Sequence, residues 1–170
     1  MDPRTVTESR SELVQWMGPA DANASGFVHG GTVMKLCDEA AATAAIRHSR
    51  MRVVTAAVDR MTFLAPVHVG ELLTLKSSVN AVWRTSMEVG VRVDSENPIT
   101  GEVRHTNSAY VTMVAVDEDG RPVAAVPGLR CENADELRRE REAQVRRANR
   151  LAERDQLIEH RAAEDAAQPA

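Results

Sequence analysis

The chain has 170 residues, which is the size of one domain with one hydrophobic core. Hydrophobic residues make up 43% of it and charged residues 27%, as is typical of a globular protein. A net charge of −4 and an aromatic content of 3% argue against a dedicated nucleic-acid-binding protein. No apolar run approaches the roughly 20 residues that cross a bilayer, and the N-terminal segment lacks a signal-peptide core. We therefore expect a cytoplasmic protein that binds neither nucleic acid nor a membrane.

Motifs for metals, cofactors and serine nucleophiles are missing from the sequence. Cys37 and Cys131 form neither a CxxC pair nor a disulfide framework, which fits a reducing compartment. The five histidines never pair at metal-ligand spacing on one predicted element, so no metal site is predicted. A Gly-x-Ser-x-Gly elbow, a P-loop and a dinucleotide fingerprint are also missing, and we expect no cofactor.

The first predicted elements lead into one long helix. Residues 8–16 are a short, weakly apolar candidate strand, and the polar residues 21–27 predict a loop. From His29 to His48 the chain is rich in alanine and other strong helix formers, with no Gly after Gly31, which predicts a helix.

After this helix the apolar residues recur with a period of two, which is typical of strands. The pattern covers residues 54–58, 71–83, 86–93 and 103–116, with turn residues between them. Short connections predict antiparallel pairing, because parallel strands need long crossovers. One helix against an antiparallel sheet of about five or six strands is an α+β fold.

The chain is predicted to divide into a domain, residues 8–127, and a charged C-terminal extension, residues 128–170. Residues 134–166 contain almost no β-branched side chains and predict a helix that frays over residues 166–170. Seven Arg and three Glu lie between Arg138 and Arg154, so this part is locally basic. A solvated helix lying on the surface explains the pattern, and a phosphate-facing or subunit-bridging role stays open.

One acidic residue of the central helix lacks an evident partner. On a helical wheel, the apolar face consists of Val33, Leu36, Cys37, Ala40, Ala41 and Ala44. Glu39 lies on the opposite face and is explained by an i,i+4 pair with Lys35. Asp38 lies at the margin of the apolar stripe. It is either satisfied by a backbone amide or a Thr from another strand, or it is a base held at a cleft.

The start of the helix adds a candidate oxyanion-binding site. Gly30 and Gly31 leave first-turn N–H groups without side chains that block approach, at the positive end of the helix dipole. Such donors accept an anion or a polarised carbonyl oxygen, and Asp38 follows two turns later. This layout suits attack on a carbonyl, although a tight turn alone also explains two glycines.

The strings DANASGFVHGG, residues 21–31, and MKLCDEA, residues 34–40, resemble the acyl-CoA thioesterases of the hotdog fold. The chain is similar to the cytosolic brain-type acyl-CoA hydrolases and their bacterial single-domain relatives. Further matching pieces follow in unbroken order from Leu13 to Pro127, among them Val54-Thr55, Phe63-Leu64 and residues 84–89. The charged tail is similar to the helical extension of some bacterial members.

This resemblance implies a long helix wrapped by an antiparallel sheet, in a homodimer. In the family such dimers often assemble further as a trimer of dimers, and a tetramer stays open. It implies an active site at the dimer seam, where Asp38 of one protomer faces Asn23 of the partner subunit. His29, Gly30 and Gly31 at the helix N-terminus would supply the amide that polarises the thioester carbonyl.

The resemblance also implies how the substrate is bound and cleaved. Coenzyme A would bind at Arg84, Thr85 and Ser86, with Arg104 and the basic tail as further candidates. The reaction would be hydrolysis of acyl-CoA, with Asp38 as the general base on a water, or as a nucleophile. A hotdog hydratase or dehydratase and a non-catalytic acyl-CoA-binding module are the alternatives. Relatives commonly carry Asn or Asp where this chain has Phe27, which removes a polar group near the mouth of the site.

Overall fold

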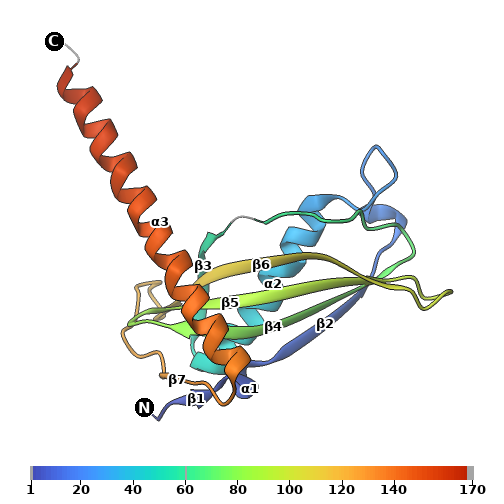
Figure 1. Ribbon diagram of the computed structural model, residues 1–170, viewed down its shortest axis with the longest axis horizontal. Helices are drawn as coiled ribbons and strands as arrows, with labels where there is room; N and C mark the ends of the chain where they lie inside the picture. The colour runs from blue at the N-terminus through green and yellow to red at the C-terminus, as the bar shows by residue number, and fades with distance from the viewer. Residues whose placement is uncertain (1, 60, 168–170) are drawn as a thin grey trace.

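The computed structural model describes residues 2–59 and 61–167, with side chains described through residue 162. A five-stranded antiparallel sheet curls around one long helix, and a second long helix crosses the outer face of the sheet and projects beyond it (Figure 1). The elements in chain order are β1 (Arg4–Thr5), α1 (Val6–Ser9), β2 (Ser11–Trp16), the 3-10 turn η1 (Pro19–Asp21), α2 (Gly30–Ser49), β3 (Arg52–Val58), β4 (Leu72–Val82), β5 (Ser86–Glu96), β6 (Val103–Val116), β7 (Leu129–Arg130) and α3 (Ala134–Ala167). This arrangement confirms the predicted α+β hotdog fold.

The main sheet has the strand order β2-β4-β5-β6-β3, and every neighbouring pair in it is antiparallel. Short turns join β4 to β5 and β5 to β6, as the turn residues predict. The strands β2 and β3 form the two edges of this sheet. The strands β1 and β7 form a separate parallel pair, which the sequence did not predict.

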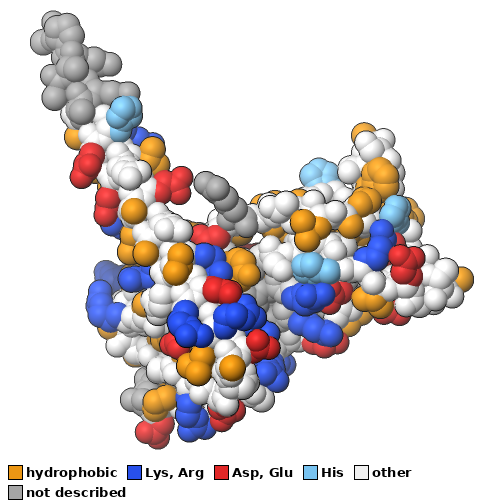
Figure 2. Space-filling view, in the orientation of Figure 1, with side chains coloured by type: hydrophobic (Ala, Val, Ile, Leu, Met, Phe, Trp, Pro, Cys, Tyr) orange, Lys and Arg blue, Asp and Glu red, His pale blue; other side chains and the backbone are white. Residues whose placement is uncertain are grey.

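The first half of α3 packs on the outer face of the sheet, and the second half is exposed. Arg146 donates two hydrogen bonds to Glu88 of β5, and its guanidinium lies 3.6 Å from the centre of the Tyr110 ring. Ala143 is fully buried, whereas residues 152–162 are all exposed. Figure 2 shows Lys and Arg side chains gathered over this first half of α3. Of the predicted frayed end, residues 168–170 lie outside the described residues.

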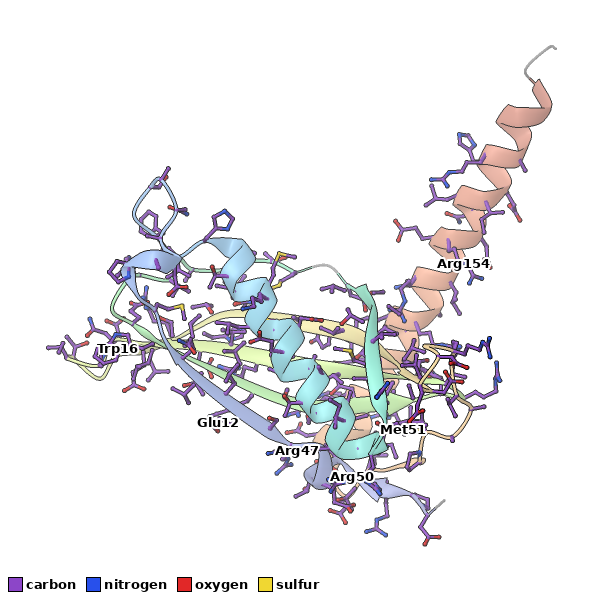
Figure 3. The ribbon with its side chains drawn as sticks, turned by 180° about the vertical axis from the view of Figure 1, so that it is seen from behind. Glu12, Trp16, Arg47, Arg50, Met51 and Arg154 are labelled. Carbon is purple, nitrogen blue, oxygen red and sulfur yellow. The ribbon has the colours of Figure 1, made fainter. Side chains whose placement is uncertain are left out.

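The central helix α2 packs against the inner face of the sheet through small side chains. All six residues predicted for its apolar face are buried, and three of them are alanines. Alanine lets the helix backbone approach the sheet, where Leu, Val and Met side chains of β4, β5 and β6 fill the core. The predicted Lys35–Glu39 pair forms on the opposite side, at 3.5 Å. Figure 3 shows α2 in front of the sheet, between β2 and β3.

Two predictions about local structure were wrong. The candidate strand over residues 8–16 begins only at Ser11, because residues 6–9 form the short helix α1. Thr5 caps this helix, since its hydroxyl accepts from the Glu8 N–H while the Glu8 carboxylate accepts from the Thr5 N–H. The strand predicted over residues 71–83 spans Leu72–Val82, and its alternation breaks where the register shifts between Val79 and Ala81, so Trp83 is not part of it. Its indole N–H donates to Gln144 of α3 at 3.0 Å.

Within residues 2–59 and 61–167, no helix combines the length and the apolar composition needed to cross a bilayer.

Candidate functional site

Asp38 lies on α2 at the margin between buried and exposed surface, as predicted, and it has a partner on β3. One of its carboxylate oxygens accepts a hydrogen bond from the Thr55 hydroxyl. The partner is thus a Thr from another strand, one of the two satisfied arrangements that the sequence left open. Asp38 is only half-buried. It therefore combines a fixed orientation with access from outside the chain.

Asn23 lies in the loop between η1 and α2, and its side-chain oxygen organises that loop. This oxygen accepts from the Ser25 N–H at 2.8 Å and from the Phe27 N–H at 3.3 Å. The loop turns through Gly26, whose φ of +81° is costly for a residue with a side chain. Because the oxygen is held by backbone donors, the NH₂ group of Asn23 is left for contacts outside the loop.

The N-terminus of α2 offers one backbone donor rather than the two that were predicted. His29 caps the helix, and its Nδ1 accepts from the Gly31 N–H at 3.0 Å. No described residue accepts from the Gly30 N–H. A Cβ on Gly30 would lie 3.5 Å from the ring of Phe63, so the glycine also leaves room for this aromatic cover.

A cavity of about 330 Å³ opens at this helix entrance. Asn23 and Gly30 both line it, together with the rings of Phe27 and Phe63 and apolar side chains of residues 28, 33 and 64–67. Asp38 does not line this cavity, since it lies eight residues along α2, which is about 12 Å of helix. One chain therefore brings Asn23 and the helix entrance together and leaves Asp38 apart from them.

The residues predicted to bind coenzyme A do not come together within one chain. Arg84, Thr85 and Ser86 lie at the turn between β4 and β5, where Arg84 is exposed. Arg104 pairs near the other end of β5, opposite Ser95, which is roughly 30 Å away along the strand.

Arg104 is engaged in a structural network. Its guanidinium forms an ion pair with the buried carboxylate of Glu71. Burial alone raises the pKa of Glu71, but the His68 N–H and the Ser95 hydroxyl, together with Arg104, hold it below its usual range. Phe27 packs edge-on against the His68 ring, with the ring centres 5.4 Å apart. The aromatic side chain of Phe27 thus joins the cavity rim to the network.

Sequence reasoning did not assign a role to Thr55 or Phe63, although both stood in the matching strings. Asp38 had no evident partner on its own helix, so it needed a hydrogen-bond donor from a neighbouring strand. This requirement could have identified Thr55. Within the described residues, no three His, Cys, Asp or Glu side chains group closely enough to hold a metal.

Comparison with known proteins identifies relatives over most of the chain. A sequence profile of the thioesterase superfamily matches residues 25–102. The chain is 36% identical to the cytosolic acyl coenzyme A thioester hydrolase of Rattus norvegicus over 155 residues, which is 90% of this chain and 40% of that relative. It therefore spans less than half the length of that relative. It is 35% identical to the uncharacterized acyl-CoA thioester hydrolase YkhA of Bacillus subtilis, over 87% of this chain and 85% of that protein.

Solved structures share the fold across almost the whole chain. An apo-hexameric acyl-CoA thioesterase superposes with a TM-score of 0.86 at 38% identity, covering 90% of this chain and 97% of that one. An acyl-CoA hydrolase of Staphylococcus aureus, in complex with butyryl coenzyme A and coenzyme A, superposes with a TM-score of 0.84 at 31% identity, covering 97% and 99%.

Three further structures of the S. aureus hydrolase are variants in which an asparagine, an aspartate or a threonine is replaced by alanine. These positions follow one another at intervals of 15 and 17 residues, which is the spacing of Asn23, Asp38 and Thr55 here. Shared fold, shared identity over most of the chain and the matching profile together show that this chain belongs to the hotdog-fold thioesterase superfamily.

Proposed function

We propose that this protein hydrolyses acyl-CoA thioesters to a carboxylic acid and coenzyme A. The observation that carries the proposal is Asp38, a half-buried carboxylate fixed by Thr55 at the edge strand β3. The spacing of Asn23, Asp38 and Thr55 supports it, because the same spacing separates the residues replaced in the S. aureus hydrolase.

The active site is completed by a second subunit. The hydrogen bond from Thr55 ties Asp38 to β3, whose outer side has no strand partner among the described residues. Pairing of two β3 edges about a two-fold axis joins the sheets and sets the two α2 helices side by side. Asp38 of one protomer then meets the helix entrance and Asn23 of the partner subunit, which closes the separation of about 12 Å within one chain.

In this site Asp38 acts as the general base. It takes a proton from a water that the NH₂ group of Asn23 of the partner subunit orients, and the resulting hydroxide attacks the thioester carbonyl. The free Gly30 N–H and the helix dipole stabilise the negative charge that develops on the carbonyl oxygen. The C–S bond then breaks, and the proton held by Asp38 passes to the leaving thiolate. Attack by Asp38 itself, through an anhydride, is the alternative route.

Substrate binding follows from the surroundings of this site. The aromatic-lined cavity next to Gly30 takes the acyl chain, because its walls are mostly apolar. The exposed Arg84, with Thr85 and Ser86, binds the nucleotide of coenzyme A, whose phosphates attract a cation. Arg104 is the weaker candidate for that role, because Glu71 already holds it.

The assembly is a homodimer that forms a trimer of dimers, as the hexameric relative suggests. We also infer a cytoplasmic location, in line with the cytosolic rat relative.

Release of free thiol from acyl-CoA tests the activity, followed with a thiol reagent on the purified full chain. A panel of acyl chain lengths identifies the preferred substrate. A hydratase frees no thiol and a pure binding module retains its ligand, so either outcome overturns the proposal.

A further inference from the structure

A serine, a histidine and an aspartate form a chain of contacts on the outer face of the sheet, away from α2. The Ser108 Oγ lies 3.3 Å from His105 Nε2, and His105 Nδ1 lies 3.2 Å from a carboxylate oxygen of Asp94. A nucleophile, a base and an acid that orients the base stand in this order in serine hydrolases.

An irregularity in β6 creates the contact. Residues three apart on a regular strand point to opposite faces, so His105 and Ser108 would be separated by the sheet. The register between β5 and β6 shifts between Val93 and Asp94, and Thr106 is the extra residue. This bulge turns His105 onto the face of Ser108.

The contacts of His105 orient its ring between Asp94 and Ser108. Arg92 binds both oxygens of Asp94, with 3.0 Å contacts, which holds this carboxylate in place. An ionised carboxylate only accepts hydrogen bonds, so His105 donates to it from Nδ1–H. With Nδ1 facing Asp94, Nε2 faces the Ser108 hydroxyl, which is a donor that a neutral imidazole accepts. His105 is therefore oriented as a base toward Ser108.

Ser108 lines a cleft of about 720 Å³ between the outer face of the sheet and the first half of α3. Gly90 and Asn80 both line the cleft, and the glycine leaves room for the Asn80 side chain, which a Cβ at this position would meet at 2.6 Å. Six Lys and Arg and only two Glu line the cleft. Ser108, Arg92 and Lys76 stand side by side on successive strands. The cleft therefore favours a negatively charged ligand.

We propose that Ser108, His105 and Asp94 form a second nucleophilic site that cleaves activated carboxylic esters carrying a negative charge. The Ser108 oxygen attacks the ester carbonyl, and its proton moves to His105 Nε2. The bond to the leaving alcohol oxygen breaks, and that oxygen takes the proton from His105. Water then attacks the acyl-serine with His105 again accepting the proton, which restores Ser108 and releases the acid.

Among the described residues, the site has no backbone N–H donors for the oxyanion, and this restricts the class of substrate. The strand N–H groups around Ser108 take part in the sheet ladder, so the oxyanion must be stabilised by Lys76 and by the guanidinium nitrogen of Arg92 that does not bind Asp94. Flexible cations do this less well than preorganised backbone donors. Cleavage is therefore confined to esters with good leaving groups, such as nitrophenyl esters.

The experiment compares hydrolysis of 4-nitrophenyl succinate, an anionic ester, with that of neutral 4-nitrophenyl acetate. It uses the full chain in an Asp38→Ala background, so that the proposed thioesterase site contributes no base. Ser108→Ala and His105→Ala are each expected to lower kcat/KM for the succinate ester by about 10²-fold. Ser78→Ala is the matched control, because Ser78 lines the same cleft without contacting a histidine, and it is expected to leave the rate unchanged.

A covalent readout completes the test. A fluorophosphonate probe is expected to label Ser108, mapped by peptide mass spectrometry, and the label should disappear in His105→Ala. Equal rates for the Ser108 and Ser78 variants, or labelling that is missing or independent of His105, would overturn the proposal. Thiol release by the wild-type chain is measured in parallel, so failure of this site is distinguishable from failure of the thioesterase proposal. Retained circular dichroism shows that each variant is folded.

Discussion

Asp38 on the inner side of the sheet and Asp94 on its outer face are both fixed aspartates, but their partners differ in charge. A neutral hydroxyl, that of Thr55, holds Asp38. The guanidinium of Arg92 holds Asp94. The guanidinium contacts both oxygens of Asp94, whereas the hydroxyl of Thr55 contacts one oxygen of Asp38. In the proposed mechanisms, Asp38 itself takes the proton on the inner side, and His105, rather than Asp94, takes it on the outer face.

Replacing the inner carboxylate gives the largest expected effect. Asp38→Asn keeps the shape and removes the base, so kcat for thiol release should fall by about 10²–10⁴-fold. Glu39→Gln is the matched control, because Glu39 is the next residue on α2 and makes only an exposed pair with Lys35. Equal losses in the two variants would show that Asp38 has no special role.

Stability on the outer face depends on Arg146. Arg146→Ala leaves the fully buried Glu88 without its cation, and the free energy of unfolding should drop by about 3 kcal/mol. Denaturant unfolding measures this. Arg154→Ala removes an exposed pair with Asp155 and should change stability by less than about 0.5 kcal/mol. If the two variants lose equal stability, α3 is not anchored by the buried pair.

The hydroxyl that holds Asp38 has a smaller effect. Thr55→Val preserves the shape of β3 and removes the donor, so kcat should fall by about tenfold, as expected for one hydrogen bond to a charged group. Thr43→Val is the control, since Thr43 bonds only to the backbone of its own helix. A kcat unchanged by Thr55→Val would mean that Asp38 is oriented by something else.

The smallest expected effect is on the stability of the fold at acid pH, and it involves a residue with no proposed catalytic role. Burial, together with the nearby guanidinium of Arg4, lowers the pKa of His48 at the end of α2. The unfolded chain therefore takes up a proton at His48 at a higher pH than the folded chain does. The contribution of His48 to the free energy of unfolding is fully present above about pH 6.5. It declines as the pH falls toward the pKa of His48 in the folded chain. His48→Gln should flatten the pH dependence of unfolding between pH 7 and 5, and an unchanged slope would contradict the assignment.

The sequence predicted the parts of the fold that depend on periodicity. The buried face of α2, the alternating strands and the margin position of Asp38 follow from local spacing, and the structure has all three. The short helix α1 was missed even though the Thr5-x-x-Glu8 capping box is a local signal for it.

Other features depend on how distant segments meet. The contact of Thr55 with Asp38 requires the register of β3 beside α2, and the contact of His105 with Ser108 requires the bulge at Thr106. No local pattern in the sequence encodes either one. The ion pair that takes Arg104 away from the predicted coenzyme A site is equally non-local, because Glu71 lies on the other side of β5.

The decisive measurement mixes two inactive proteins. Asp38→Ala and Asn23→Ala chains are unfolded together, refolded as a 1:1 mixture and assayed for thiol release. Random pairing gives half mixed dimers with one intact site each, so a shared site predicts recovery of about a quarter of the wild-type rate. Each variant refolded alone supplies the baseline. A mixture no more active than that baseline would contradict a site built from two subunits.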